Sequence, residues 1–304
     1  MLRVVYVAGW LRSGTTLLCQ SLGSIPGAVA LGEVSGVWRA AALGQPCSCG
    51  EPIPYCPVWG PALDRVRHDC GVARSDLRSV AVLATEVLRT RDSPRLRRLG
   101  RPSAGQPVDL PPEVSRYVEL TGALLLAAAR AAGASTVVDS SKLPPGFLTL
   151  RLHPDVRVDV VHLIRDPRAV VNSERRSRAR PGVDPALLPP VRPALKSALY
   201  WSAANIAIRR YARSAASYRV VCYEDFTATP DACLSLLSTG LGLARPRLIE
   251  QDTGASGHLA VGNPSRFRTS AQAITEDRSW QTQLPWADRA LVTALSRPVH
   301  FWLT

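Results

Sequence analysis

Lysine is almost absent from this sequence: of its 37 basic residues, only Lys142 and Lys196 are lysines. Against 24 acidic residues the formal net charge is +13, which by itself would favour an anionic partner such as nucleic acid, a membrane surface or a phosphorylated ligand. An Arg- and Ala-rich chain is also what a GC-rich genome produces. This composition bias is the favoured explanation, the alternative being a functional positive field confined to one site, and we expect no nucleic acid as partner.

Long apolar runs are also missing. No stretch reaches the roughly 20 uninterrupted apolar residues that cross a bilayer, and the longest candidate, 124–132, contains Arg130. Residues Met1–Gly9 run directly into a strand pattern without the small-residue cleavage site of a signal peptide. These absences predict a cytoplasmic protein with no membrane partner.

The seven cysteines are odd in number, so they cannot all form pairs within the chain. Cys47, Cys49 and Cys56 lie close together, and His68 and Cys70 follow. Three thiolates with His68 or Cys70 would be enough for a zinc ion, but the spacing matches no standard zinc finger. A disulfide or redox pair and buried free thiols are the other two interpretations. The sequence leaves this choice open.

Apolar, β-branched runs alternate with helix-like segments along the chain. Strands are predicted at 4–8, 136–138, 156–164 and 218–223, and helices at 15–24, 117–132, 168–178, 196–216 and from Pro230 onward. This alternation predicts an α/β fold, with a mostly parallel central sheet flanked by helices. The Pro- and Arg-rich segments 93–112 and 180–193 are predicted loops or lids. Because the core pattern resumes after each, we expect residues 1–304 to form a single domain.

A glycine-bounded turn, Gly9–Thr16 (G-W-L-R-S-G-T-T), follows the first predicted strand. It has the frame of a phosphate loop, G-x-x-x-x-G-K-[ST], with Thr15 in the position of the lysine. Backbone N–H groups at the helix start would still point at an anion, Ser13 and Thr16 would add hydroxyl donors, and Arg12 would supply a cation. A nucleotide kinase uses the lysine with Mg²⁺, whereas a sulfuryl group carries less negative charge and can be transferred without a metal.

Residues Gly9–Leu18 resemble the 5′-phosphosulfate loop of sulfotransferases that use 3′-phosphoadenosine 5′-phosphosulfate (PAPS), above all tyrosylprotein and bacterial sulfotransferases. The segment 160–173 resembles a second landmark of that family: Arg165 ends a predicted strand and Ser173 follows eight residues later, a pair that in the family holds the 3′-phosphate. The two landmarks occur in the family's order, roughly 150 residues apart. The resemblance implies the P-loop-like sulfotransferase fold, PAPS as cosubstrate and no metal.

Further matches extend the resemblance along most of the chain. Tyr223-Glu224 resembles the family's Tyr-Glu dipeptide near the nucleotide, and the segment from His258 to Arg268 resembles the part that closes over PAPS in bacterial members. Together with the segment 180–193 it would roof a basic cleft. The resemblance thus assigns cosubstrate contacts to Arg12, Ser13, Gly14, Thr15, Thr16, Leu17, Arg165, Ser173, Tyr223, Gly262, Asn263, Arg266 and Arg268.

Transfer to a hydroxyl needs a base and a cation near the leaving oxygen. The tyrosylprotein enzymes carry a catalytic glutamate after a similar loop and helix, and the resemblance gives this role to Glu33. It gives Lys142 the role of a family lysine that contacts the bridging oxygen, and Arg12 a share in catalysis. Cytosolic small-molecule sulfotransferases have a catalytic histidine near the position of Lys142, so this chain departs from that branch. Asp139 would either orient Lys142 or cap the following turn.

Two other classes of protein stay open at this point. A small-molecule kinase would keep the loop and use Asp139 as a magnesium ligand, but it should carry lysine in place of Thr15. A non-catalytic nucleotide-binding protein would explain the charge but gives no reason for Glu33 or Lys142. For a sulfotransferase, a hydroxyl of a bacterial specialised metabolite, a carbohydrate or a lipid fits better than a protein tyrosine. The sequence leaves the acceptor's identity and a homodimer open.

Overall fold

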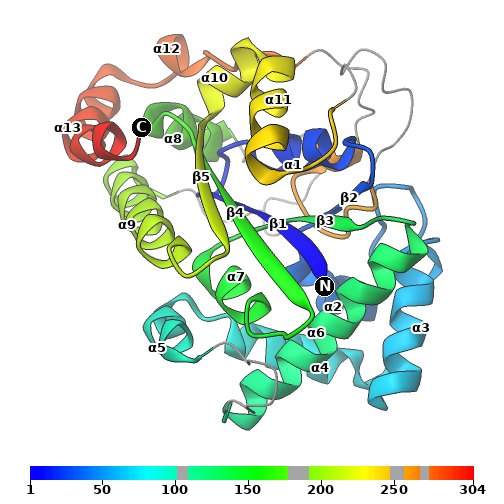
Figure 1. Cartoon of the computed structure of the whole chain (residues 1–304). Helices are drawn as coiled ribbons and strands as arrows, with labels where there is room; N and C mark the ends of the chain where they lie inside the picture. Colours follow the sequence, from blue (N-terminus) through cyan, green and yellow to red (C-terminus); the bar gives the residue numbers. More distant parts are fainter. Residues whose placement is uncertain (101–108, 177–191, 247–256, 268–273) are drawn as a thin grey trace.

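The computed structural model describes residues 1–100, 109–176, 192–246, 257–267 and 274–304. A five-stranded sheet forms its centre, and every neighbouring pair of strands is parallel. In spatial order the strands are β2 (Ala28–Gly32), β3 (Thr136–Lys142), β1 (Leu2–Ala8), β4 (Val156–Ile164) and β5 (Ser217–Cys222). The prediction of an α/β fold with a mostly parallel sheet is confirmed (Figure 1).

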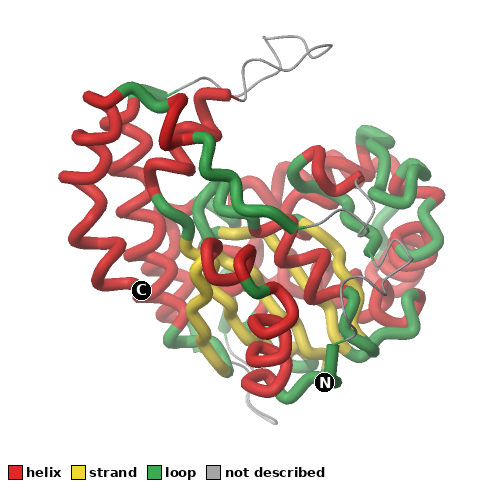
Figure 2. The backbone as a smooth tube through the Cα atoms, turned by 90° about the horizontal axis from the view of Figure 1, so that it is seen from above, coloured by secondary structure: helices red, strands yellow, loops and turns green. Residues whose placement is uncertain are grey.

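Both faces of the sheet are covered. Val5 and Val7 belong to an apolar cluster with α1 (Thr15–Gly23) and α11 (Pro230–Leu241). Val4 and Tyr6 belong to a second cluster, with α6 (Pro112–Ala131) and α7 (Pro144–Leu150). Figure 2 shows the strands in the middle of the molecule with helices around them. Burial on both faces explains why the strands read as continuous apolar runs rather than alternating ones.

The remaining helices complete the two layers. They are α2 (Val37–Ala42), α3 (Trp59–Cys70), α4 (Leu77–Val87), α5 (Ser93–Arg98), α8 (Pro167–Arg176), α9 (Ala194–Ala212), α10 (Tyr223–Ala228), α12 (Trp280–Gln283) and α13 (Trp286–Leu303). Single 3₁₀ turns are η1 (Val34–Gly36), η2 (Ile53–Tyr55), η3 (Arg74–Asp76), η4 (Thr90–Asp92) and η7 (Pro264–Phe267). Among the residues described, no helix combines the length and the apolar character needed to cross a membrane.

Two connecting segments were predicted to be loops or lids. For 93–112 this prediction is wrong at the start, because Ser93–Arg98 forms α5, whose Leu96 is buried in the core. The predicted lid at 180–193 lies almost entirely outside the described residues. Strand β2 was not predicted, since it is only five residues long and ends in glycine.

The order of the strands places the candidate site. The chain leaves β1 toward β2 on one side, and later crosses from β3 over β1 to β4 on the other. Ligands of open parallel sheets bind beyond the carboxyl ends of the strands, where such a reversal occurs. The carboxyl ends of β1, β3 and β4 carry the phosphate loop, Lys142 and Arg165, so the predicted residues converge on this edge.

Candidate functional site

Two glycines shape the loop between β1 and α1. A Cβ atom on Gly9 would lie 2.7 Å from the carbonyl oxygen of Leu163, and one on Gly14 would lie 2.6 Å from the ring of Tyr223. Gly14 also has a φ of +89°, in the left-handed region that favours glycine. The packing of the loop against β4 and the start of α10 therefore requires both glycines of the predicted frame.

The start of α1 offers unpaired donors. The N–H group of Leu18 donates to the Gly14 carbonyl oxygen at 3.1 Å, so the N–H groups of residues 15–17 precede the helical hydrogen-bond ladder. Next to them the hydroxyl of Ser13 is fully buried and has no hydrogen-bond partner among the described residues. A buried polar group without a partner is costly. An anion held at this helix start would satisfy these donors.

Arg12 joins the loop to the second predicted landmark. Its Nε donates to the Ser173 hydroxyl oxygen at 3.1 Å, and its carbonyl oxygen accepts a hydrogen bond from Nη1 of Arg165 at 2.9 Å. Its φ of +66° is unusual for a residue other than glycine. Arg165 and Ser173, eight residues apart in the sequence, are thus brought to the same place through Arg12.

Arg165 is buried between an aromatic ring and a carboxylate. Its guanidinium lies 4.4 Å from the ring centroid of Tyr223, and its Nη2 lies 3.4 Å from Asp277. Burial of Asp277 favours its neutral form, but hydrogen bonds from Ser279 and Arg176 prevail and lower its pKa to about 2. The Nε of Arg165 has no partner among the described residues. Sequence reasoning missed Asp277, because nothing in its neighbourhood links it to Arg165.

Glu33 and Lys142 form an ion pair at the carboxyl ends of β2 and β3. The side chains are 24% and 9% exposed, so a strong charge pair is largely removed from water beside the phosphate loop. Lys142 has a φ of +74°, in the left-handed region. Such a conformation is uncommon for a long side chain and is often found at functional sites. Two of the three residues predicted for catalysis, Glu33 and Lys142, are therefore in direct contact.

The Asp139 carboxylate binds donors near the end of β3 and in η1. Its Oδ1 accepts hydrogen bonds from the Ser141 N–H at 2.8 Å, the Ser141 hydroxyl at 2.5 Å and the Val34 N–H at 3.3 Å. Complete burial raises the pKa of this carboxyl to about 6, against the effect of these bonds. The sequence led to two possible roles, orienting Lys142 or capping the following turn, but the hydrogen bonds of Asp139 go to Ser141 within β3 and to Val34 in η1. Through Val34 it also fixes the residue that follows Glu33.

Residues 257–267, which we call the C-terminal strap, run beside β2. The N–H of His258 donates to the Ala30 carbonyl oxygen at 2.8 Å, and that of Ala260 donates to Leu31 at 3.1 Å. The N–H of Glu33 in turn donates to the Val261 carbonyl oxygen at 3.0 Å. The strap therefore runs along the edge strand β2, with which it forms an isolated parallel bridge, and leads directly to the Glu33–Lys142 pair.

The end of the strap lies between Glu33 and α1. A Cβ on Gly262 would lie 3.7 Å from Glu33 Oε1 and 3.5 Å from the Thr16 hydroxyl, which also accepts a hydrogen bond from the Asn263 N–H at 3.4 Å. Arg266 folds back and donates to the Gly262 carbonyl oxygen at 2.9 Å. Arg268, predicted to share this role, lies outside the described residues.

An aromatic pair that was not predicted lies beside the loop. Trp10 stacks on Tyr200 with their ring centroids 6.2 Å apart, and its Nε1 donates to Glu174 at 3.2 Å. Glu174, only 10% exposed, also accepts a hydrogen bond from Ser197 at 2.7 Å. The tryptophan inside the phosphate-loop frame was the sequence signal for this aromatic pair. The stacked rings offer an apolar surface next to the carboxylate of Glu174.

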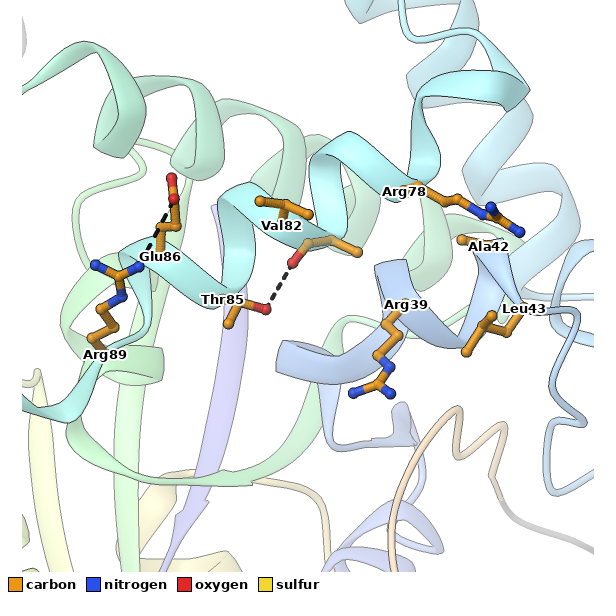
Figure 3. A pocket seen from close by; sticks show the side chains of 9 residues that line it. Arg39, Ala42, Leu43, Arg78, Val82, Thr85, Glu86 and Arg89 are labelled. Atoms are coloured by element: carbon orange, nitrogen blue, oxygen red, sulfur yellow. Dashed lines mark hydrogen bonds and ion pairs between the residues drawn. The ribbon is translucent and has the colours of Figure 1, made fainter. Parts of the chain in front are cut away.

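A separate pocket lies between α2 and α4 (Figure 3). Arg39, Arg78, Arg89 and Glu86 line it together with smaller side chains, and Arg89 lies 3.8 Å from Glu86. None of the residues predicted for the site lines this pocket. Part of the chain's positive charge is therefore found away from the sheet edge.

Comparison with known proteins shows the fold. No protein-family profile and no curated protein matches the sequence. Among solved structures, the sulfotransferase domain of the olefin synthase of Synechococcus PCC 7002 matches with 19% identity and a TM-score of 0.51, covering 97% of this chain and 94% of that domain. The protein therefore has the fold of a sulfotransferase domain, and the resemblance seen in the sequence is confirmed at this level.

Two further solved structures match along most of the chain. A sulfotransferase domain from the curacin biosynthetic pathway has 14% identity and a TM-score of 0.45, covering 97% of this chain and 98% of its own. Retinol dehydratase, solved in complex with androsterone and the inactive cofactor PAP, has 14% identity and a TM-score of 0.36, covering 97% of this chain and 80% of its own.

Proposed function

We propose that this protein is a sulfotransferase that moves the sulfuryl group of PAPS onto a hydroxyl of a small acceptor. One observation carries the proposal. An anion-binding helix start and a largely buried pair of opposite charges, Glu33 and Lys142, meet at one edge of a sheet with the sulfotransferase fold. A protein that only bound nucleotides would gain nothing from the charge pair, which is costly to desolvate.

The two ends of the cosubstrate would be held by different groups. The N–H groups of residues 15–17 and the Ser13 hydroxyl supply donors for the 5′-phosphosulfate, and Arg12 supplies the positive charge that the loop lysine would give. Arg165 and Ser173 would hold the 3′-phosphate. An anion there would take the Nε of Arg165 and compete with Asp277 for its Nη2.

Tyr223 and the strap would complete the cosubstrate site. The Tyr223 ring already packs against Gly14 and Arg165, between the two phosphate positions. Gly262 and Asn263 contact the start of α1 through Thr16, and Arg266 would close over the phosphosulfate, as we also expect of Arg268.

The two members of the charge pair would have different roles in the transfer. Glu33 would accept the proton of the acceptor hydroxyl as its oxygen attacks sulfur. The bond between sulfur and the bridging phosphate oxygen breaks, and Lys142 would stabilise the charge that develops on that oxygen, leaving 3′,5′-adenosine bisphosphate (PAP). Contact between the two side chains keeps each charge compensated before substrates bind. We assign no metal to this step.

A phosphoryl-transferring kinase is disfavoured by Asp139. A magnesium ligand must present its carboxylate to the nucleotide, but three protein donors converge on the Oδ1 of this buried side chain. Thr15 also stands in place of the lysine on which kinases depend.

The stacked rings of Trp10 and Tyr200 favour an acceptor with an apolar or ring-shaped body. Tyr200 is 43% exposed and accessible from solvent. A phenol, a sugar ring or a lipid hydroxyl of a specialised metabolite meets this condition.

The test is a transfer assay with a panel of such acceptors, analysed by mass spectrometry for the gain of one sulfuryl group. The wild-type protein should form product with PAPS and without added metal. Glu33→Gln should form product at least about 100-fold more slowly with acceptors that are not ionised, whereas the surface variant Glu119→Gln should behave as wild type. The proposal would be contradicted if the protein transferred a phosphoryl group from ATP in the presence of Mg²⁺ and transferred no sulfuryl group from PAPS.

A further inference from the structure

Four side chains that can bind a metal meet outside the proposed active centre. Cys47 and Cys49 lie in the loop between α2 and η2, Cys56 directly follows η2, and His258 comes from the strap. Their ligand atoms all lie within 4.8 Å of one another. Since 202 residues separate Cys56 from His258, local sequence does not explain the convergence.

The distances fit a tetrahedral metal site better than a disulfide. The sulfur atoms of Cys47 and Cys56 are 3.6 Å apart, and Cys56 Sγ is 3.2 Å from His258 Nδ1. Zn–S bonds of about 2.3 Å and Zn–N bonds of about 2.0 Å place tetrahedral ligands about 3.5–3.8 Å from one another. A disulfide would need sulfurs about 2.05 Å apart.

A tight turn holds two of the four ligands together. The Cys47 N–H donates to the Glu51 carbonyl oxygen at 2.8 Å, and the Gly50 N–H donates to the Cys47 carbonyl oxygen at 2.9 Å, with a φ of +96° at Gly50. This turn places the sulfurs of Cys47 and Cys49 in one group with Cys56 and His258.

The strap backbone is held at the cluster by further bonds. Trp59 Nε1 donates to the His258 carbonyl oxygen at 2.6 Å, and Ser48 Oγ donates to the Gly257 carbonyl oxygen at 2.9 Å. Cys47 and Cys56 are completely buried, whereas Cys49 and His258 are half-buried. A closed set of four protein ligands is typical of a structural rather than a catalytic zinc.

We propose that Cys47, Cys49, Cys56 and His258 bind one zinc ion that fastens the strap to the loop after α2. This inference does not rest on the proposed transfer reaction. It replaces the ligand sets considered from sequence: the imidazole of His68 is 87% exposed and contacts Asp69, and Cys70 ends α3 outside the cluster. The ion would fix the segment that carries Gly262 and Arg266 to the Glu33–Lys142 pair.

Metal content of the full-length protein, purified without chelator, tests the proposal. We expect one zinc per chain in the wild type and a loss of at least tenfold in Cys56→Ser and His258→Gln. Cys70→Ser and His68→Gln are matched controls, because they change the same residue types outside the cluster, and they should keep the zinc. Full zinc occupancy in Cys56→Ser would overturn the proposal.

A second measurement on the wild type covers the case in which a variant fails to fold. Cobalt(II) in place of zinc should give the intense visible bands of a tetrahedral site and a thiolate-to-metal charge-transfer band. Peptide mapping without reductant would reveal a Cys47–Cys56 disulfide, and that bond in a metal-free protein would contradict the assignment. Because no cosubstrate or acceptor is present, either result leaves the transfer proposal to its own test.

Discussion

The phosphate loop and the Glu33–Lys142 pair lie at the same edge of the sheet but are built in different ways. The loop presents backbone N–H groups. The side chain of its Arg12 donates to the Ser173 hydroxyl oxygen, and the Arg12 carbonyl oxygen accepts a hydrogen bond from Arg165. The pair instead sets two opposite charges in contact, one of them on a residue with a left-handed backbone.

The difference separates binding from chemistry. Arg165 is proposed to hold the 3′-phosphate, away from the reacting sulfur, so it would stabilise the bound cosubstrate equally before and during the reaction and act on affinity. The Glu33 carboxylate and the Lys142 ammonium contact each other before substrates bind. In the reaction each would contact a reacting group instead, so the pair would act mainly on the chemical step. Substitutions in the two regions should therefore affect different constants.

The largest effect is expected at the charge pair. Glu33→Gln keeps the size of the side chain but cannot accept a proton, so turnover should fall by about 10²- to 10⁴-fold while the affinity for PAP changes little. Steady-state kinetics and calorimetry on the same preparation measure the two quantities. A similar loss in turnover and in PAP affinity would contradict the proposal that the two regions act on different steps.

Lys142→Ala should also reduce turnover. If the lysine acts like an oxyanion donor, its loss should raise the activation free energy by about 2.7 to 4 kcal/mol. Acceptors of different acidity distinguish the two variants. An acceptor that is already ionised at the assay pH should rescue Glu33→Gln and leave Lys142→Ala impaired. If both variants respond alike to acceptor acidity, the roles given to them are wrong.

A smaller effect, on cosubstrate binding rather than on turnover, is expected at the residues proposed to hold the 3′-phosphate. Arg165→Ala combined with Ser173→Ala should weaken PAP binding by at least about 10-fold, because the loss of even one hydrogen bond to a charged group costs about 1.5–3 kcal/mol. Turnover at saturating PAPS should change little. Arg168→Ala is the control, because this neighbouring arginine is held by Asp166. Unchanged PAP affinity in the double variant would refute the 3′-phosphate assignment.

The smallest effect concerns stability away from both regions. Burial lowers the pKa of His162 to about 4, and its ring nitrogens contact Asn205 and Tyr218. The unfolded chain binds this proton below about pH 6.5 and the folded protein only near pH 4, so the contribution of His162 to the free energy of unfolding should decline by up to about 3 kcal/mol as the pH falls across that range.

Denaturant unfolding at several pH values measures this decline. His162→Gln should flatten it, whereas His68→Gln, which changes an exposed histidine, should retain the wild-type slope. Equal slopes in the two variants would show that His162 does not carry the effect.

The sequence predicted those features whose causes are local. The phosphate loop and the Arg165 turn each follow an apolar strand directly, so residue type and spacing were enough to find them. Glu33 and Lys142 could be named from the family resemblance, but their contact depends on β2 and β3 being neighbours, which periodicity did not reveal. Asp277 and the partnership of His258 with three cysteines depend on contacts across more than 100 residues, for which a single sequence holds no signal.

Calorimetry with PAP and with ATP, each with and without Mg²⁺, tests the central claim most directly. PAP should bind without Mg²⁺ and more tightly than ATP under every condition, because the loop lacks the kinase lysine and because we propose that Arg165 and Ser173 hold a 3′-phosphate. Tighter binding of ATP that depends on Mg²⁺ would contradict it.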